Sequence, residues 1–189
     1  MPTELSDGER KILLKLARET IACAVRRQPL PELDWQGMPP VFKEPGVCFV
    51  TLTMDGELRG CIGALEAYQP LAEDVREHAA AAALEDYRFL PVHPDELPEL
   101  EIEISRLTTP LPLPYSSPDD LLHKLRPGID GVILRYASRR ATFLPQVWEK
   151  IPQPERFLSH LCAKMGVAED EWQKHKMDVY IYEVEEFHE

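Results

Sequence analysis

Residues 47–62 constrain the fold more than any other stretch of the sequence, because they contain two strands and the turn that joins them. Residues 47–53 read VCFVTLT, a run rich in the β-branched and aromatic side chains that favour strands. Asp55 and Gly56 form a dipeptide typical of a two-residue hairpin turn, and residues 58–62 return as LRGCI. The sequence therefore predicts an antiparallel β-hairpin.

The return strand of this hairpin carries an arginine and a cysteine at alternate positions. Side chains alternate between the two faces of a strand, so Arg59 and Cys61 are expected on one face. With a two-residue turn, the simple register places Cys61 opposite Val50 and Arg59 opposite Leu52. A guanidinium one strand repeat from a thiol favours the thiolate by charge attraction. Arg59 and Cys61 are therefore our candidate catalytic residues.

Glycines surround the candidate thiol. Gly60 and Gly63 leave bare backbone on either side of Cys61, so a ligand or another loop has room to approach the main chain. We therefore take Gly60 and Gly63 as candidate ligand-binding residues. The alternative is that Cys61 is a small buried hydrophobic side chain and that the glycines mark a β-bulge.

The rest of the sequence alternates between helical and strand patterns. The predicted helices cover about 7–28, 70–82, 117–125 and 155–164, and the further predicted strands cover 100–107, 132–136, 141–144 and 179–184. Hairpins interleaved with helices indicate an α+β fold, an α/β mixture in which a mainly antiparallel or mixed sheet is flanked by helices.

Prolines punctuate the chain in four clusters. The chain has 18 of them, about twice the usual ~5%, and we interpret them as rigid connections within a compact fold rather than as a disordered linker. They cluster at 29–45, 91–98, 110–118 and 145–154. We therefore expect one folded domain over residues 1–189.

The composition disfavours two classes of partner. The 21 basic residues against 33 acidic ones give a net charge of −12, which repels phosphate backbones, so nucleic acid is an unfavourable partner. No run of ~18 apolar residues occurs, so no membrane span is expected. The polar N-terminal residues lack the apolar core of a signal peptide, which makes the cytoplasm the expected compartment.

No motif in the sequence predicts a cofactor or a metal ion. The four cysteines have no metal-type spacing and are expected to be free thiols, and nucleotide-binding loops are absent. His78 shares a predicted helix face with Leu71, Val75 and Ala82, so we interpret it as a core histidine rather than a ligand.

Five motifs follow one another in an order found in a known family. They are LRGCIG at 58–63, DYRFLPV at 86–92, LEIEIS at 100–105, LPQV at 144–147 and ERFLSHLCAKMG at 155–166. On these motifs the chain, from about Gly46 to Trp172, resembles the AMME chromosomal region gene 1 protein family. Bacterial members of that family are labelled AmmeMemoRadiSam system protein A.

The resemblance implies a fold and a set of partners. It implies two lobes of unequal size with LRGCIG lining a cleft between them, and we expect the smaller lobe to comprise roughly 29–46 and 108–150. It also implies the company of a radical S-adenosylmethionine (SAM) enzyme and a Memo-like protein. It implies no settled reaction.

The resemblance also adds three polar residues to the candidate site. Arg88, Glu103 and Gln146 stand at motif positions, and we take them as candidate ligand-binding residues. Arg88 and Glu103 are expected to pair, because a buried charge needs a partner; the alternative is that this pair is only structural. Gln146 is expected to supply an amide donor or acceptor.

Three hypotheses of function remain open at this point. The chain is a protein that uses Cys61 with Arg59, covalently or to hold a small anion, alongside a radical enzyme. Alternatively, it is a non-catalytic interaction module for one of the implied partners. In the third hypothesis it is an RNA-associated module in which Tyr87, Arg88 and Phe89 contact a base, against the unfavourable net charge.

Overall fold

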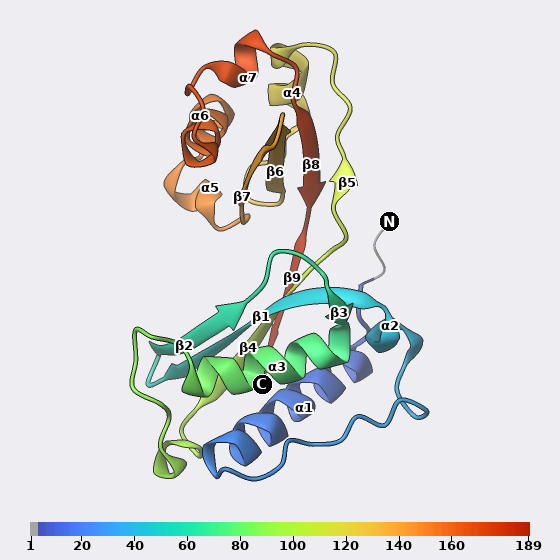
Figure 1. Cartoon of the computed structure of the whole chain (residues 1–189), viewed down its shortest axis with the longest axis vertical. Coiled ribbons are helices and arrows are strands. Elements are labelled where there is room, and N and C mark those ends of the chain that lie inside the picture. The colour runs from blue at the N-terminus through green and yellow to red at the C-terminus, as the bar shows by residue number, and fades with distance from the viewer. Residues whose placement is uncertain (1–3) are drawn as a thin grey trace. The chain divides into compact units, whose positions relative to one another are not determined.

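The computed structural model describes residues 4–189 and contains two compact units (Figure 1). The first unit comprises the residues up to Leu107 together with Glu185–Glu189, and the second comprises Thr108–Val184. Both combine helices with antiparallel strands, which confirms the predicted α+β fold. None of the helices in residues 4–189 combines the length and the apolar character that a membrane-spanning helix needs.

The boundary between the units differs from the lobes expected from the sequence. Residues 29–46 belong to the first unit, and the second unit continues past residue 150 to Val184.

The first unit is a sheet with helices against one face (Figure 1). Its strands have the order β2-β1-β4-β9, and β3 pairs with one end of β1. The strands are β1 (Pro45–Met54), β2 (Glu57–Gly63), β3 (Gln69–Pro70), β4 (Glu101–Leu107) and β9 (Val184–His188). The helices are α1 (Asp7–Val25), α2 (Pro40–Lys43), α3 (Leu71–Leu84) and the 3-10 turn η1 (Pro94–Glu96).

The N-terminal cap of α1 is of the kind that its sequence encodes. The Ser6 hydroxyl accepts the N–H of Glu9, and the Glu9 carboxylate accepts the N–H of Ser6, so two otherwise unpaired donors are satisfied. The helix ends at Val25, earlier than the predicted end near residue 28, because Arg27 adopts a left-handed backbone with φ 57°.

The face of the first sheet that meets α1 and α3 is apolar. Cys48, Val50 and Leu52 on β1 and Ile102 and Ile104 on β4 are buried in one core with the helices. Because side chains alternate along a strand, the residues between them point to the opposite face of the sheet, away from these helices. The candidate site is built on that opposite face.

The second unit is a smaller antiparallel sheet with the order β5-β8-β6-β7. Its strands are β5 (Leu111–Pro112), β6 (Gly131–Tyr136), β7 (Arg139–Phe143) and β8 (Asp178–Tyr182). Its helices are α4 (Pro118–Lys124), α5 (Val147–Lys150), α6 (Pro154–Met165) and α7 (Glu171–Lys174). The Trp148 and Phe157 rings stack at 3.6 Å between centroids in its core.

Two strand predictions in this part of the chain need correction. The connection predicted at residues 138–140 is shorter, because Ala137 takes φ 52° and β7 already begins at Arg139. The single last strand predicted at 179–184 is two strands, β8 and β9, which belong to different sheets. Alternation alone does not reveal such a break.

Gly60 allows α3 to lie directly on β2. A Cβ atom at this position would collide with the backbone carbonyl oxygen of Ala82 on α3. The alanines of α3 add to this close approach, because Ala79, Ala82 and Ala83 are buried against the sheet with little side chain between the two backbones. Gly60 is thus a packing residue of the LRGCIG motif.

We expect Gly60→Ala to lower the free energy of unfolding by about 1–3 kcal/mol, the usual cost of overpacking against atoms that cannot move aside. Urea denaturation followed by circular dichroism measures the change. Gly8→Ala is the control, because nothing lies within 4 Å of a Cβ at that helical position, and its stability should be unchanged or slightly higher. Equal stability of Gly60→Ala and the wild type would contradict this packing role.

Candidate functional site

A β-bulge in the hairpin shifts the register of the LRGCIG motif. Thr53 pairs with Leu58, as the two-residue turn requires, but the next pair is Leu52 with Gly60. Arg59 is therefore an extra residue on β2 with no partner position of its own on β1. The alternative interpretation predicted a bulge in this strand, but the extra residue is Arg59 rather than a glycine, and Cys61 is half-buried rather than buried.

The bulge changes the face on which Cys61 lies. The simple register would have placed Cys61 opposite Val50, which belongs to the core under the helices. Cys61 instead pairs with Thr51, whose side chain points to the opposite face. The predicted pairs of Cys61 with Val50 and of Arg59 with Leu52 are therefore wrong, because one extra residue exchanges the faces of every position that follows.

The Cys61 thiol is half-buried and touches a hydroxyl. Its Sγ lies 3.2 Å from Oγ1 of Thr51 across the strand pair. Its backbone N–H donates to Oδ2 of Asp86 at 2.9 Å. The thiol thus has a defined position, set by a neighbouring strand on one side and by the segment after α3 on the other.

Asp86 and Arg88 form a two-pronged ion pair beside Cys61. Nε of Arg88 donates to Oδ1 of Asp86 at 2.9 Å and Nη2 donates to Oδ2 at 2.6 Å, while Nη2 also lies 3.4 Å from the Cys61 carbonyl. The guanidinium, helped by two backbone N–H donors, holds the pKa of the buried Asp86 carboxyl far below its usual range. Arg88 thus pairs with Asp86, and the predicted pair with Glu103 is wrong.

Arg59 hydrogen-bonds to the segment after α3 and not to the Cys61 thiol. Its Nε and Nη2 donate to the Glu96 carboxylate at 2.7 and 3.0 Å, and its Nη1 donates to the Leu90 carbonyl at 2.9 Å. The guanidinium lowers the pKa of Glu96. Because Glu96 balances the charge of Arg59, the expected activation of Cys61 by this arginine has no geometric support.

Glu103 lies on the same face as Cys61, two strands away. It pairs with Thr51, which in turn pairs with Cys61. Burial raises the pKa of Glu103 and the Glu186 carboxylate adds to this, while His188 acts in the opposite direction. Strands are ~4.8 Å apart, so about 10 Å separates the two backbones, too far for direct proton transfer.

The other two predicted ligand residues fall in different places. A Cβ at Gly63 would collide with the Phe49 ring and the Cys48 carbonyl, so this glycine, like Gly60, is required by packing. Gln146 is an exposed residue at the start of α5 in the second unit. The structure therefore brings Cys61, Thr51 and Glu103 together on one face of the first sheet, with Arg88 beside Cys61.

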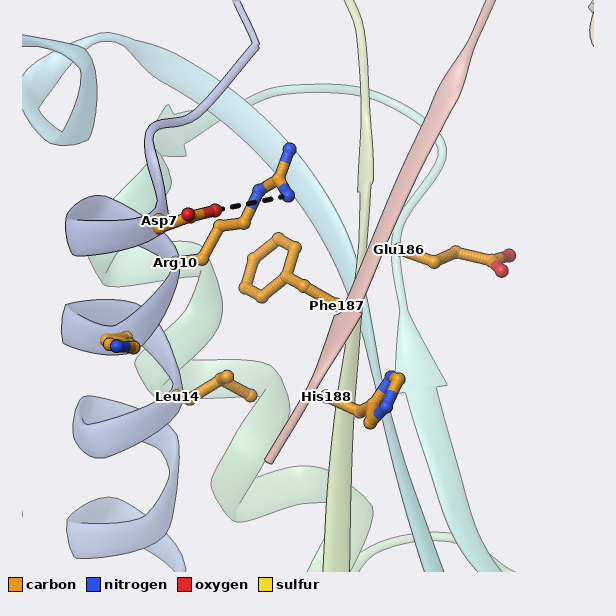
Figure 2. A pocket seen from close by; sticks show the side chains of 7 residues that line it. Asp7, Arg10, Leu14, Glu186, Phe187 and His188 are labelled. Atoms are coloured by element: carbon orange, nitrogen blue, oxygen red, sulfur yellow. Dashed lines mark ion pairs between the residues drawn. The ribbon is translucent and has the colours of Figure 1, made fainter.

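A pocket of about 310 Å³ lies between α1 and β9 (Figure 2). Phe187 points from β9 towards α1, whereas Glu186 and His188 point to the other side of the strand (Figure 2). Arg10 in this pocket is already held by Glu185 at 2.8 Å, so its charge is balanced. Some 170 residues separate the two walls in the sequence, and no local pattern could have predicted the pocket.

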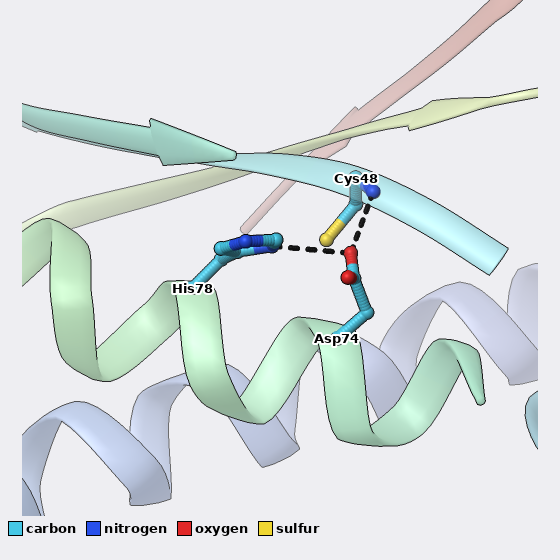
Figure 3. Close-up of side chains that lie close together, drawn as sticks. All are labelled: Cys48, Asp74 and His78. Atoms are coloured by element: carbon cyan, nitrogen blue, oxygen red, sulfur yellow. Dashed lines mark hydrogen bonds and ion pairs between the residues drawn. The ribbon is translucent and has the colours of Figure 1, made fainter. Parts of the chain in front are cut away.

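A second polar cluster lies in the apolar core on the helix side of the sheet (Figure 3). It consists of Cys48, Asp74 and His78, all buried. The Asp74 carboxylate accepts the Cys48 backbone N–H at 2.8 Å and lies 3.1 Å from Nδ1 of His78. Burial, together with Asp74, raises the pKa of the Cys48 thiol well above its usual value. The predicted core position of His78 is confirmed, whereas its buried neighbours Asp74 and Cys48 were not predicted.

These features define a class of protein: a two-unit α+β chain whose first sheet carries a bulged Arg-Gly-Cys strand tied to the segment after the following helix. The AMMECR1 family model matches residues 14–187, and the chain belongs to this family. This confirms the resemblance read from the motifs.

Archaeal relatives and one solved structure agree with this assignment. A protein from Thermofilum pendens is 37% identical over 97% of this chain and 91% of its own length. One from Methanothermobacter thermautotrophicus is 38% identical over 98% and 96%. The crystal structure of the uncharacterized protein PH0010 from Pyrococcus horikoshii is 31% identical, covers 98% of this chain and 93% of its own, and superposes with a TM-score of 0.78.

We expect Glu103→Gln to stabilise the protein at pH 7. The raised pKa of Glu103 means that the folded state disfavours the carboxylate, so the neutral amide removes a cost that is present above the folded pKa. Below the unfolded value of about 4.3 the wild-type side chain is protonated in both states, and the difference should vanish. Urea denaturation at pH 7 and near pH 4 tests this.

Glu101→Gln is the matched control for this experiment, since Glu101 is an exposed carboxylate two residues away on the same strand. It should change stability less than Glu103→Gln at pH 7. A Glu103→Gln variant that is less stable than the wild type at pH 7 would show that the carboxylate has a favourable partner in the folded chain.

Proposed function

We propose that this protein is an interaction module that docks onto a partner protein through residues 86–91, which we call the docking loop. The observation that carries the proposal is the exposure of two large apolar side chains on this loop. Tyr87 is 95% exposed and Leu90 is 83% exposed. Large apolar side chains that a fold holds out in water at neighbouring positions are typical of interaction surfaces.

The docking loop is held at both ends by hydrogen bonds, although most of its side chains are exposed. Asp86, the first residue of the loop, accepts the Cys61 N–H. Near the end of the loop, Arg59 donates to the carbonyls of Leu90 and Pro91. The N–H of Val92 donates to the Ala83 carbonyl at 2.8 Å, which returns the chain to α3. A loop that is ordered before binding loses little conformational entropy on docking.

The side chains of the loop match those that dominate binding interfaces. Tyrosine and arginine are enriched among the residues that contribute most of the binding energy. Arg88 lies between Tyr87 and the half-buried Phe89, and its guanidinium is 5.5 Å from the centre of the Phe89 ring. The loop thus offers apolar anchors and a cation within a few residues.

The partners that we propose are the radical SAM enzyme and the Memo-like protein of the resemblance. The family assignment and the docking loop support this choice, and the net charge of −12 supports a protein partner over a nucleic acid. An RNA partner would need the same aromatic side chains, so it is tested as a competing outcome.

The Tyr87→Ala, Leu90→Ala double variant should bind the partner at least about tenfold more weakly than the wild type, the loss expected when an interface anchor is removed. Biolayer interferometry with the two purified partners from the same genome measures the dissociation constant. Ile129→Ala is the control, since Ile129 is 48% exposed in the second unit, and it should leave the affinity unchanged. Both substituted side chains are largely exposed, so the fold should persist.

Two results would overturn this proposal. Full affinity in the double variant would show that the docking loop is not the interface. Binding of single-stranded RNA at low salt that is lost with Tyr87→Ala, in the absence of protein binding, would assign the loop to RNA.

A second candidate function is thiol chemistry at Cys61 beside the same loop. The observation that favours it is a half-buried thiol on the face of the sheet away from α1 and α3, next to a hydroxyl and in one row with Glu103. All four cysteines are free thiols, as a reducing compartment such as the cytoplasm would keep them. In this proposal Cys61 is the nucleophile, and Arg59 acts through the loop that it holds.

Alkylation with iodoacetamide, resolved by mass spectrometry for each cysteine, should modify Cys61 before Cys48 and Cys162, whose thiols are buried and have raised pKa values. Cys23 is the matched control, because it is a half-buried thiol on α1 remote from the motif. A Cys61 thiol that reacts no faster than Cys23 would remove the basis for a catalytic role and leave the docking proposal intact.

A further inference from the structure

The buried cluster of Cys48, Asp74 and His78 combines three types of metal ligand at one point of the first unit (Figure 3). The three side chains are 0%, 0% and 6% exposed. One potential ligand atom of each lies within 4.8 Å of the others. Asp74 and His78 are one helical turn apart on α3, and Cys48 faces them from β1, so two rigid elements present the three groups.

Part of this arrangement has a purely structural explanation. Along β1, strand β2 ends at Gly63 and β3 begins only at Gln69, and the Cys48 N–H falls between these two partners. Asp74 fills the gap by accepting this N–H. That role accounts for the carboxylate. The thiol and the imidazole that hydrogen-bond to it are in addition two common zinc ligands.

Asp74 differs from Asp86, the other buried aspartate of the unit, in the groups that surround its carboxylate. Asp86 has a guanidinium at 2.6 Å that balances its charge. The side-chain partners of Asp74 are His78 and the Gln69 amide, which donates at 3.3 Å to Oδ1, and neither carries a permanent positive charge. A fully buried carboxylate is stabilised by a cation, so the cluster has the electrostatics of a cation site.

We propose that Cys48, Asp74 and His78 together bind one Zn²⁺ ion. Sulfur, nitrogen and oxygen donors in one set fit zinc and exclude calcium or magnesium, which take oxygen ligands. Nδ1 of His78 and Oδ2 of Asp74 are 3.1 Å apart, close to the roughly 3.3 Å between two ligands of a tetrahedral zinc ion. The Cys48 sulfur, which lies within 4.8 Å of a ligand atom of each, completes the set.

The charges of the complex balance. Cys48 releases its thiol proton to solvent and binds as a thiolate, Asp74 binds as a carboxylate, and His78 binds as a neutral imidazole. The two positive charges of the ion offset the two negative ligands. Gln69 becomes an outer partner, since its amide bridges Asp74 and Glu77 and orients the ligating carboxylate.

Cobalt(II) is the probe for this site, because a thiolate bound to Co²⁺ gives an intense near-ultraviolet absorption band and a tetrahedral site gives visible bands. The full chain is freed of metal with a chelator and titrated with Co²⁺. We expect saturation at one equivalent and displacement by Zn²⁺. Zn²⁺ should also raise the melting temperature of the wild type, because it binds the folded state.

The variants separate a metal site from a hydrogen-bonded core pair. Cys48→Ser should lose the near-ultraviolet band, and His78→Gln should weaken Co²⁺ binding by more than about tenfold. Cys162→Ser removes a buried thiol of the second unit and should leave the spectrum unchanged. If Cys48→Ser does not fold, the zinc-dependent rise in melting temperature of the wild type, compared with that of His78→Gln, decides the matter.

Three results would overturn the proposal. The folded wild type shows no thiolate-to-cobalt band at stoichiometric Co²⁺, the band survives Cys48→Ser, or Zn²⁺ raises the melting temperature of His78→Gln as much as that of the wild type. Each would assign the cluster to strand capping alone.

Discussion

The bulge at Arg59 is the constraint on which the candidate site depends. Without the extra residue, Cys61 would lie opposite Val50 in the core under α3, and Gly60 would lie on the other face. With it, the bare backbone of Gly60 meets the Ala82 carbonyl and the thiol faces away from the helices. The glycine therefore makes the close approach of α3 possible in the one register that turns Cys61 outwards.

The contacts that hold the bulge also hold the docking loop. Arg59, the extra residue, donates to Glu96 and to the Leu90 carbonyl, while Asp86 links the Cys61 N–H to Arg88. The thiol and the loop are therefore parts of one hydrogen-bonded unit. A partner that displaces the docking loop would also displace the Asp86 carboxylate, which accepts the Cys61 N–H. The two proposed functions therefore depend on the same residues.

The sequence predicts the parts of this unit better than their connections. The hairpin, its Asp55-Gly56 turn and the helix that follows are encoded locally, by strand propensity and by turn chemistry, and the structure confirms them. The bulge depends on the Ala82 carbonyl of α3, which lies over Gly60. The hairpin residues do not specify that contact. The Arg88–Glu103 pair failed for a related reason: Asp86 is two residues from Arg88, and a local partner is entropically less costly than one on β4.

The two buried aspartates of the first unit show how α3 is attached to the hairpin. Asp74 in its first turn accepts the N–H of Cys48 on β1, and Asp86 just beyond its last turn accepts the N–H of Cys61 on β2. Each carboxylate replaces a missing strand partner, so the two attachments do the same structural work. They differ in their side-chain partners: a guanidinium balances the charge of Asp86, whereas Asp74 lies beside an imidazole and a thiol. The thiol and the imidazole beside Asp74 are the difference on which the proposed zinc site rests.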